Sequence, residues 1–320
     1  MNINTNRITR VHAAQLNPAT SLRVGRSGTR PAILARGRRD WRHVPWWLYA
    51  LLLLGGLCMI VPFVWMLVTS IKPSAEIYTT AILPKHPTLA NYANVLRKTS
   101  FPRWFMNSLI TAGLTTLSVA LFDSLSGFVL ALYDFPGKRV IFMLILSTLM
   151  VPTEMLVLPW YLMSVQNHWV RGDVTSIGDY AAGYWAIMFP GLVTGFGVFL
   201  MRQFFEGVPR DLFEAARLDG VSEFGLFWRV GLPSVRPAIA ALCIFTFLGN
   251  WNAFLWPLIV TNADALRTVP VGIGFFSSDV GSAYDLIMSA ASLATLPVVI
   301  VFALFQGQIV RGIALTGLRG

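Results

Sequence analysis

Six long apolar runs constrain the fold of this chain more than any other feature of its sequence. They cover about residues 46–70, 104–133, 140–165, 181–205, 238–260 and 286–310. Each is long enough for a helix that crosses a hydrocarbon core of about 30 Å. The runs predict an all-α polytopic membrane protein with six transmembrane helices.

The composition indicates the same class of protein. Of the 320 residues, 55% are hydrophobic and 12% are charged, and the mean hydropathy is +0.61, which excludes a water-soluble domain. A net charge of +10 could indicate nucleic-acid binding, but the basic residues cluster between the apolar runs and form no face interleaved with aromatic side chains. We therefore predict no nucleic-acid partner and relate the charge to orientation in the membrane.

Most lysine and arginine residues lie on one side of this six-span layout. That side holds residues 1–43, the turn at Lys138, the polar stretch after the fourth run and the C-terminal end. Because short basic segments remain cytoplasmic, both termini are predicted to lie in the cytoplasm, with the spans in a bacterial inner membrane. The segments 72–103, 166–180 and 261–285 are then external, the first with little regular structure.

The N-terminal stretch, residues 1–43, is basic, with Asp40 as its one acid, and has no sustained hydrophobic period. It is predicted to be a disordered cytoplasmic tail attracted to anionic membrane lipid, not a signal peptide. Residues 44–320 form the membrane domain. Within that domain, Pro62, Pro152 and Pro159 predict kinked or broken helices.

The polar stretch at residues 208–237 predicts two short helices that meet at a corner and lie along the membrane surface. Pro209 suits a helix start, and Gly220 suits the end of that helix because it tolerates a left-handed backbone. Ser222 can cap the second helix, which Pro233 ends. The apolar residues of the first helix are Leu212 and Ala216, and those of the second are Phe224, Phe227 and Trp228.

A short amphipathic stretch of this kind is commonly a connecting loop that packs on its own bundle, but its residue spacing favours a second interpretation. Glu214-Ala215-Ala216 is followed after three residues by Gly220, and after nine more by Val230-Gly231-Leu232-Pro233. The pattern resembles the EAA loop of binding-protein-dependent ABC importers, which reads EAA, three residues, Gly, nine residues, Ile, any residue, Leu-Pro. Only Val230 departs from it, and valine keeps the β-branched shape of isoleucine.

The resemblance extends from about residue 46 to residue 320 and is strongest to the smaller permease of maltose-type carbohydrate importers. Further matching stretches are Asn107-Ser108, residues 135–138, residues 150–152 with Pro159, Trp251-Asn252, residues 256–258, and the ending at residues 312–320.

The resemblance implies a cytoplasmic coupling loop at about residues 206–237 and several partners. These are a second homologous permease, two ATPase subunits and an extracytoplasmic solute-binding protein. Glu214 would be the charged anchor in a cleft of an ATPase, and Gly220 would permit the bend. The other implied coupling residues are Ala215, Ala216, Asp219, Leu232 and Pro233.

No Gly-x4-Gly-Lys-Ser/Thr pattern occurs in the sequence, so ATP and Mg²⁺ are expected on the partner subunits. This chain is predicted to hold no cofactor or metal and to be a transport subunit, not an enzyme.

Polar residues inside the spans are candidates for the substrate route, because such groups are costly in a membrane. Glu154, between Pro152 and Pro159, either faces the substrate route or is a paired or hydrated carboxyl near the outer interface. Asn250, Trp251 and Asn252 have side chains that suit sugar binding, and interhelical hydrogen bonds are their alternative role. Asp123 is a weaker candidate, since Ser124 and Ser126 could satisfy its carboxylate. In the maltose-type family most sugar contacts belong to the partner permease.

Other functions fit less well. A glycerol phosphate, amino acid or polyamine permease shares the same architecture. A proton-coupled secondary transporter would be expected to show internal repeats and several carboxylates or histidines within its spans. A membrane enzyme would need a catalytic or metal-ligand arrangement, but the four histidines are scattered through the tail and loops.

Overall fold

The computed structural model describes residues 45–170, 172–279 and 283–317, and the chain divides into two units, Met1–Gly56 and Leu57–Gly320. The predicted basic tail, 1–43, and the last three residues of the 312–320 ending lie outside the described residues. The described residues contain helices and no strand. The principal helices are α1 (Trp46–Ser70), α2 (Ala90–Lys98), α3 (Phe101–Leu132), α4 (Lys138–Thr148), α5 (Val157–Gln166), α6 (Ile177–Met188), α7 (Gly195–Glu206), α8 (Arg210–Leu218), α9 (Glu223–Gly225), α10 (Leu232–Ser234), α11 (Arg236–Trp251), α12 (Leu255–Val260), α13 (Val269–Asp279) and α14 (Tyr284–Gly317).

The all-helical membrane fold predicted from the apolar runs is confirmed. Three helices are individually long and apolar enough to cross a membrane: α1, α3 and the 284–307 part of α14. Three further candidates are bent pairs, residues 138–148 with 153–166, residues 177–191 with 195–206, and residues 223–234 with 236–251, bent by 93°, 54° and 82°. If each pair is one span, the described chain has up to six.

The break in the third predicted span has a local cause. The third predicted span stops at Thr148 and resumes after Pro152, whose ring removes a backbone donor and disfavours a helical residue before it. The fifth span, predicted at residues 238–260, ends as α11 at Trp251 and resumes as the short α12 at Leu255.

The expectation of little regular structure in residues 72–103 holds for residues 77–89 and is wrong for most of the rest of the segment. This segment contains α2, and α3 begins at Phe101. The segment at 261–285 likewise contains α13. Both short helices pack in one apolar cluster with α3 and α14. These contacts join residues far apart in the sequence, so the sequence of either segment alone does not indicate them. The buried members of the cluster are Val95, Phe101, Trp104, Val269, Phe276 and Ala290.

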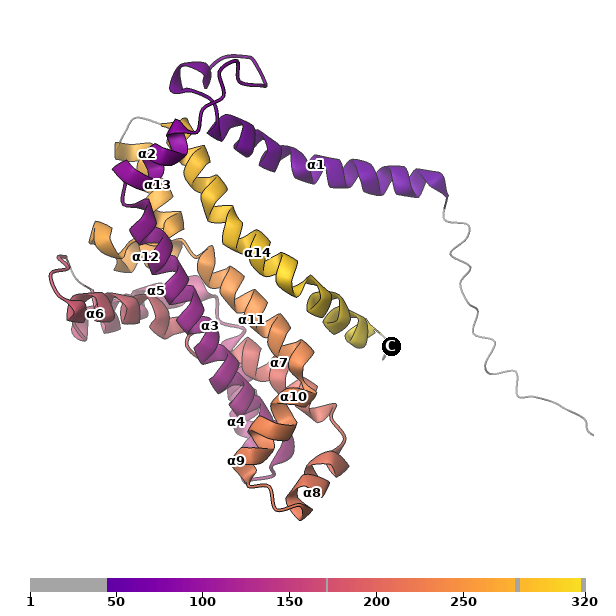
Figure 1. The fold of residues 1–320 in the computed structure, drawn as a ribbon. Coiled ribbons are helices and arrows are strands. Elements are labelled where there is room, and N and C mark those ends of the chain that lie inside the picture. Colours follow the sequence, from indigo (N-terminus) through magenta and orange to yellow (C-terminus); the bar gives the residue numbers. More distant parts are fainter. Residues whose placement is uncertain (1–44, 171, 280–282, 318–320) are drawn as a thin grey trace, which may run out of the picture. The chain divides into compact units, whose positions relative to one another are not determined.

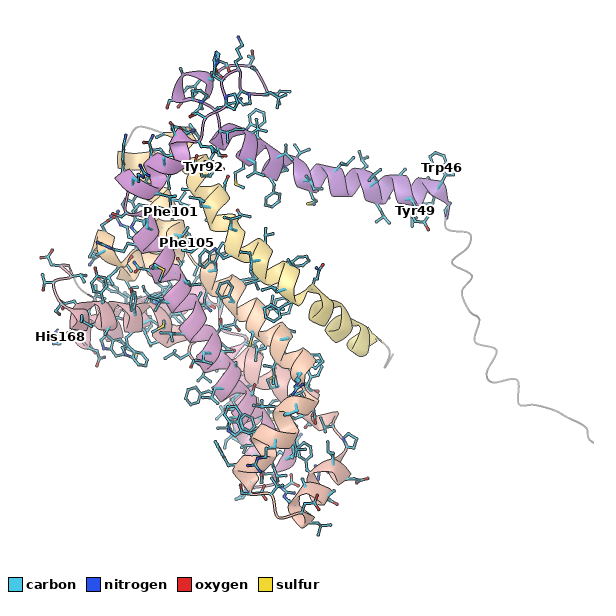
Figure 2. All side chains as sticks on the ribbon, viewed as in Figure 1. Trp46, Tyr49, Tyr92, Phe101, Phe105 and His168 are labelled. Atoms are coloured by element: carbon cyan, nitrogen blue, oxygen red, sulfur yellow. The ribbon has the colours of Figure 1, made fainter. Side chains whose placement is uncertain are left out.

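Helix α3 is the central element of the second unit. It packs against α6, α7, α11 and α13, and it runs from beside α2 and α13 to the region of α9 (Figure 1). Phe101 and Phe105 lie on its first turns (Figure 2), and Phe105 packs edge-on against Trp251 with ring centroids 5.3 Å apart. Position and orientation of α6, α7 and α11 therefore depend on α3.

Asn107 of α3 holds the segment that follows α12. Its Nδ2 donates to the backbone carbonyls of Ala265 at 2.8 Å and Arg267 at 2.9 Å, and its Oδ1 accepts from the Tyr184 hydroxyl at 2.9 Å. The neighbouring Ser108 Oγ accepts from the Val269 amide at 2.8 Å. Asn107 and Ser108 thus supply partners to backbone groups between α12 and α13 and at the first residue of α13.

We predict that Asn107→Ala destabilises the protein, because two carbonyls and a tyrosine hydroxyl lose their partner at a site that is 1% exposed. The cost is about 1–3 kcal/mol for each buried polar group left unpaired. A thermal melt in detergent measures it. Asn167→Ala is the control, since that exposed side chain bonds only to the Met163 carbonyl of its own helix; equal melting temperatures for the two variants would contradict the prediction.

Candidate coupling loop

The first helix of the loop and the corner after it form as predicted. Helix α8 begins directly after Pro209 and is followed by Gly220, whose φ is +81°. The Gly220 amide donates to the Arg217 carbonyl at 3.0 Å, and the Val221 amide donates to the Ala216 carbonyl at 3.1 Å. A side chain at this left-handed position would cost about 1–2 kcal/mol, so glycine is the residue suited to the corner.

The second helix is continuous from Glu223 to Ser234 but changes its winding on the way. Ser222 caps it as predicted, because its Oγ accepts from the Gly225 amide at 3.2 Å. Residues Leu226–Gly231 are π-helical, and the Leu232 amide bonds to the Phe227 carbonyl five residues back. Pro233 has no amide hydrogen to continue an α-helical ladder, and the helix ends one residue later.

One face of the loop is bound to α3 through aromatic side chains. Phe213 of α8 and Phe227 of the second helix are 2% and 1% exposed, and both rings pack edge-on against Phe128, with centroids 5.9 Å and 5.4 Å away. Such pairs contribute about 0.5–1.5 kcal/mol each beyond the burial of their area. The predicted apolar face of α8 is therefore partly wrong, because Phe213 is its buried residue and Leu212 is 46% exposed.

The opposite face of the loop is exposed. Leu218 is 90% exposed, and Phe224 and Trp228, 68% and 46% exposed, pack edge-on against each other at 6.1 Å. Of the three aromatic residues predicted for the apolar face of the second helix, only Phe227 is buried against α3. The predicted coupling residues Glu214, Ala215, Asp219 and Gly220 are exposed, whereas Ala216, Leu232 and Pro233 are half-buried.

Glu214 makes no hydrogen bond or ion pair with the part of the chain that the structure describes. Its carboxylate is one turn from Leu218 on the same α-helix. The exposed face of α8 therefore combines a free negative charge with an apolar side chain that is almost fully accessible.

An ion pair across the corner joins the two helices. Arg217 donates from Nε and Nη2 to the Glu223 carboxylate at 2.9 Å and 3.1 Å, and the Tyr133 hydroxyl donates to the same carboxylate. The hydrogen bonds from Arg217 and then Tyr133 lower the pKa of Glu223. Sequence reasoning missed this cluster, although an arginine and a glutamate on either side of Gly220 were its visible signal. Tyr133 directly follows α3, so the corner is tied to the same helix as the aromatic face.

The four candidate substrate residues differ in exposure and in hydrogen bonding. Glu154 is exposed in the break between α4 and α5, and Asn252 is exposed after α11. Asn250 is half-buried and donates to the Thr246 carbonyl at 2.8 Å. Trp251 is 2% exposed, its Nε1 donates to the Ala294 carbonyl at 3.1 Å, and its ring stacks on Phe247. In this conformation Trp251 packs between helices.

The expectation that Ser124 and Ser126 satisfy Asp123 is wrong. The Asp123 carboxylate instead accepts hydrogen bonds from Thr194, and the buried Ser124 hydroxyl has no partner. No group of three or more histidine, cysteine, aspartate or glutamate residues that could hold a metal ion occurs among the described residues.

Comparisons with known proteins agree with the fold. Residues 124–315 match the family model described as "Binding-protein-dependent transport system inner membrane component". The arabinooligosaccharides transport system permease protein AraQ of Bacillus subtilis is 36% identical over 270 residues, covering 83% of this chain and 92% of AraQ. The diacetylchitobiose uptake system permease protein NgcG of Streptomyces coelicolor is 31% identical over 271 residues, covering 83% and 86%.

A solved structure shares the architecture. A chain of a bacterial ABC transporter involved in the import of the acidic polysaccharide alginate superposes with a TM-score of 0.71 at 20% identity, covering 81% of this chain and 94% of that chain. This likeness supports the helical arrangement described above.

We predict that Glu223→Gln loosens the corner at neutral pH. Amide hydrogen exchange of residues 217–228, corrected for intrinsic rates, should become about two- to fivefold faster, the size expected of an exposed ion pair. Because the folded pKa of Glu223 is lowered, the pairing stabilises the loop above the ordinary glutamate pKa of about 4.3 and is lost as the pH falls below it. Wild type and variant should therefore converge at acidic pH; an equal difference at both pH values would contradict the prediction.

Proposed function

Because the chain belongs to the family of binding-protein-dependent transport system inner membrane components, we propose that it is the permease subunit of an ABC importer that takes up a sugar or oligosaccharide. The observation that carries the carbohydrate assignment is the similarity to two permeases named for arabinooligosaccharides and diacetylchitobiose, each over 83% of this chain. The family is one of transport proteins, so this chain supplies the path and not a catalytic site.

The two faces of the loop support a coupling role. The buried face, Phe213 and Phe227 on Phe128, anchors the loop to α3. The exposed face presents Glu214 and Leu218 to a cleft on an ATPase subunit, with Ala215, Asp219 and Gly220 shaping the corner. Movement of the ATPase is passed through the anchored face to the bundle, because the Arg217–Glu223 pair keeps the two helices together.

The proposed importer contains this chain, a second homologous permease, two ATPase subunits and an extracytoplasmic solute-binding protein. The description of the family as binding-protein-dependent supports the last of these. ATP and Mg²⁺ are bound by the ATPase subunits, in keeping with the absence of a Gly-x4-Gly-Lys-Ser/Thr pattern here. The assembly lies in the bacterial inner membrane with the loop and both termini of this chain in the cytoplasm.

Along the substrate route we propose Glu154, Asn250 and Asn252 as sources of polar atoms for sugar hydroxyls. Glu154 and Asn252 are exposed in helix breaks, where a conformational change could bring them to the pore. Trp251, which the sequence also suggested for sugar stacking, keeps α11 against α14 in the present conformation and becomes available only if these helices separate.

Uptake by the assembled importer tests the substrate class. The chain is co-expressed with its co-purifying subunits, reconstituted into liposomes, and supplied with ATP inside and binding protein outside. Accumulation of a labelled pentose or N-acetylhexosamine oligosaccharide is the expected result. Accumulation of glycerol phosphate, an amino acid or a polyamine, with no oligosaccharide uptake, would contradict the carbohydrate assignment.

We predict that Glu214→Ala and Gly220→Pro leave the protein in the membrane but weaken its binding to the ATPase by at least about tenfold, as expected when one partner of a docked charge is removed. Proline cannot adopt the φ of +81° found at Gly220. Recovery of the ATPase in a pull-down, together with transport, is the measurement. Asp173→Ala is the control, because Asp173 is an exposed acid between α5 and α6. Wild-type ATPase recovery and wild-type transport in both loop variants would contradict the coupling assignment.

A further inference from the structure

A buried carboxylate lies where α7 begins. Asp123 of α3 is 0% exposed, and its Oδ1 and Oδ2 accept from the Thr194 amide at 3.1 Å and 3.2 Å. Its Oδ2 also accepts from the Thr194 hydroxyl at 2.6 Å, and that hydroxyl in turn accepts from the Gly197 amide at 3.0 Å. Thr194 is thus the N-cap of α7, and Asp123 sets the direction of its hydroxyl.

The contact is close and specific. A Cβ on Gly197 would lie 2.0 Å from Asp123 Oδ2, so only glycine permits this approach between α3 and α7. The carboxylate also lies at the positive end of the α7 dipole, which stabilises a negative charge there. Burying a carboxylate inside a membrane protein costs free energy. Asp123 is therefore expected to do more than fill space.

The position of this contact relates it to the coupling loop. Helix α7 ends at Glu206 and leads through Gly207 and Pro209 into α8. Helix α3 contacts the loop through Phe128 and is followed by Tyr133, which bonds Glu223. The chain bends by 54° between residues 177–191 and α7, directly before Thr194.

We propose that Asp123 is a positioning residue for coupling, fixing the start of α7 to α3 through Thr194. Helices α3 and α7 and the loop then move as one arm. The inference rests on the proposed function, because it assigns how a push on the loop reaches the bundle. Without the Asp123–Thr194 contact, the loop still binds the ATPase. Part of the movement of the loop then separates α7 from α3 and does not open the substrate path.

The test compares Thr194→Val, which removes the hydroxyl at nearly constant volume, with Thr194→Ser, which keeps it. Asp123→Asn is the second variant in the contact. Thr116→Val is the matched control on α3, because the Thr116 hydroxyl bonds only to the Ala112 carbonyl of its own helix. Each is assembled with the wild-type partner subunits in liposomes, and sugar uptake and ATP hydrolysis are measured together.

The expected result is a rise of about tenfold in ATP hydrolysed per sugar transported for Thr194→Val and Asp123→Asn, the factor that corresponds to loss of a hydrogen bond to a charged group. Thr194→Ser and Thr116→Val should keep the wild-type ratio. If the contact had only a structural role, fewer complexes would assemble, and those that did would hydrolyse the wild-type amount of ATP per sugar transported.

Two results overturn the proposal. One is a wild-type ratio in the assembled Thr194→Val and Asp123→Asn complexes. The other is loss of assembly in both with normal Thr194→Ser, because the contact would then serve folding and not coupling. A wild-type complex that takes up no sugar with ATP would instead contradict the proposed function itself, so the two failures are distinguishable.

Discussion

Every interruption of a helix inside a membrane must have its backbone groups bonded within the protein, because the lipid offers no hydrogen-bond partner. This chain meets that constraint with polar side chains of α3. Asn107 and Ser108 bond the segment before α13, and Asp123 bonds the start of α7. Tyr133 bonds the corner of the loop just beyond the helix end. The segment between α12 and α13, the start of α7 and the corner of the loop thus depend on one continuous helix.

The same helix explains why the coupling loop has two different faces. Phe128 contacts Phe205, Phe213 and Phe227, so α7 and both loop helices share one aromatic cluster. The other face leaves Glu214 without a hydrogen bond or ion pair to the described chain and leaves Leu218 and Phe224 largely exposed. An element anchored on one side and accessible on the other is suited to transmit force between a membrane bundle and a second protein.

The sequence predicts the elements that depend on local residue patterns. It does not predict the elements whose structure depends on contacts with residues distant in the sequence. Apolar runs identified the helical membrane fold, and Gly220 and Ser222 identified the corner of the loop, because backbone preferences act over a few residues. The helices α2 and α13 were missed because they are short and owe their order to packing on α3 and α14. The partner of Asp123 was also missed, since Thr194 is distant in sequence and two serines stood beside the carboxylate.

The coupling role is tested by placing a photo-crosslinking amino acid at Leu218, on the exposed face of α8, and separately at Phe227 of the second helix, on the anchored face of the loop. The labelled protein is irradiated within native membranes, and the products are identified by mass spectrometry. A crosslink to an ATPase subunit is expected from position 218, and crosslinks only within the chain are expected from position 227. An ATPase crosslink from position 227 alone, or none from position 218, would contradict the claim that the loop couples through its exposed face.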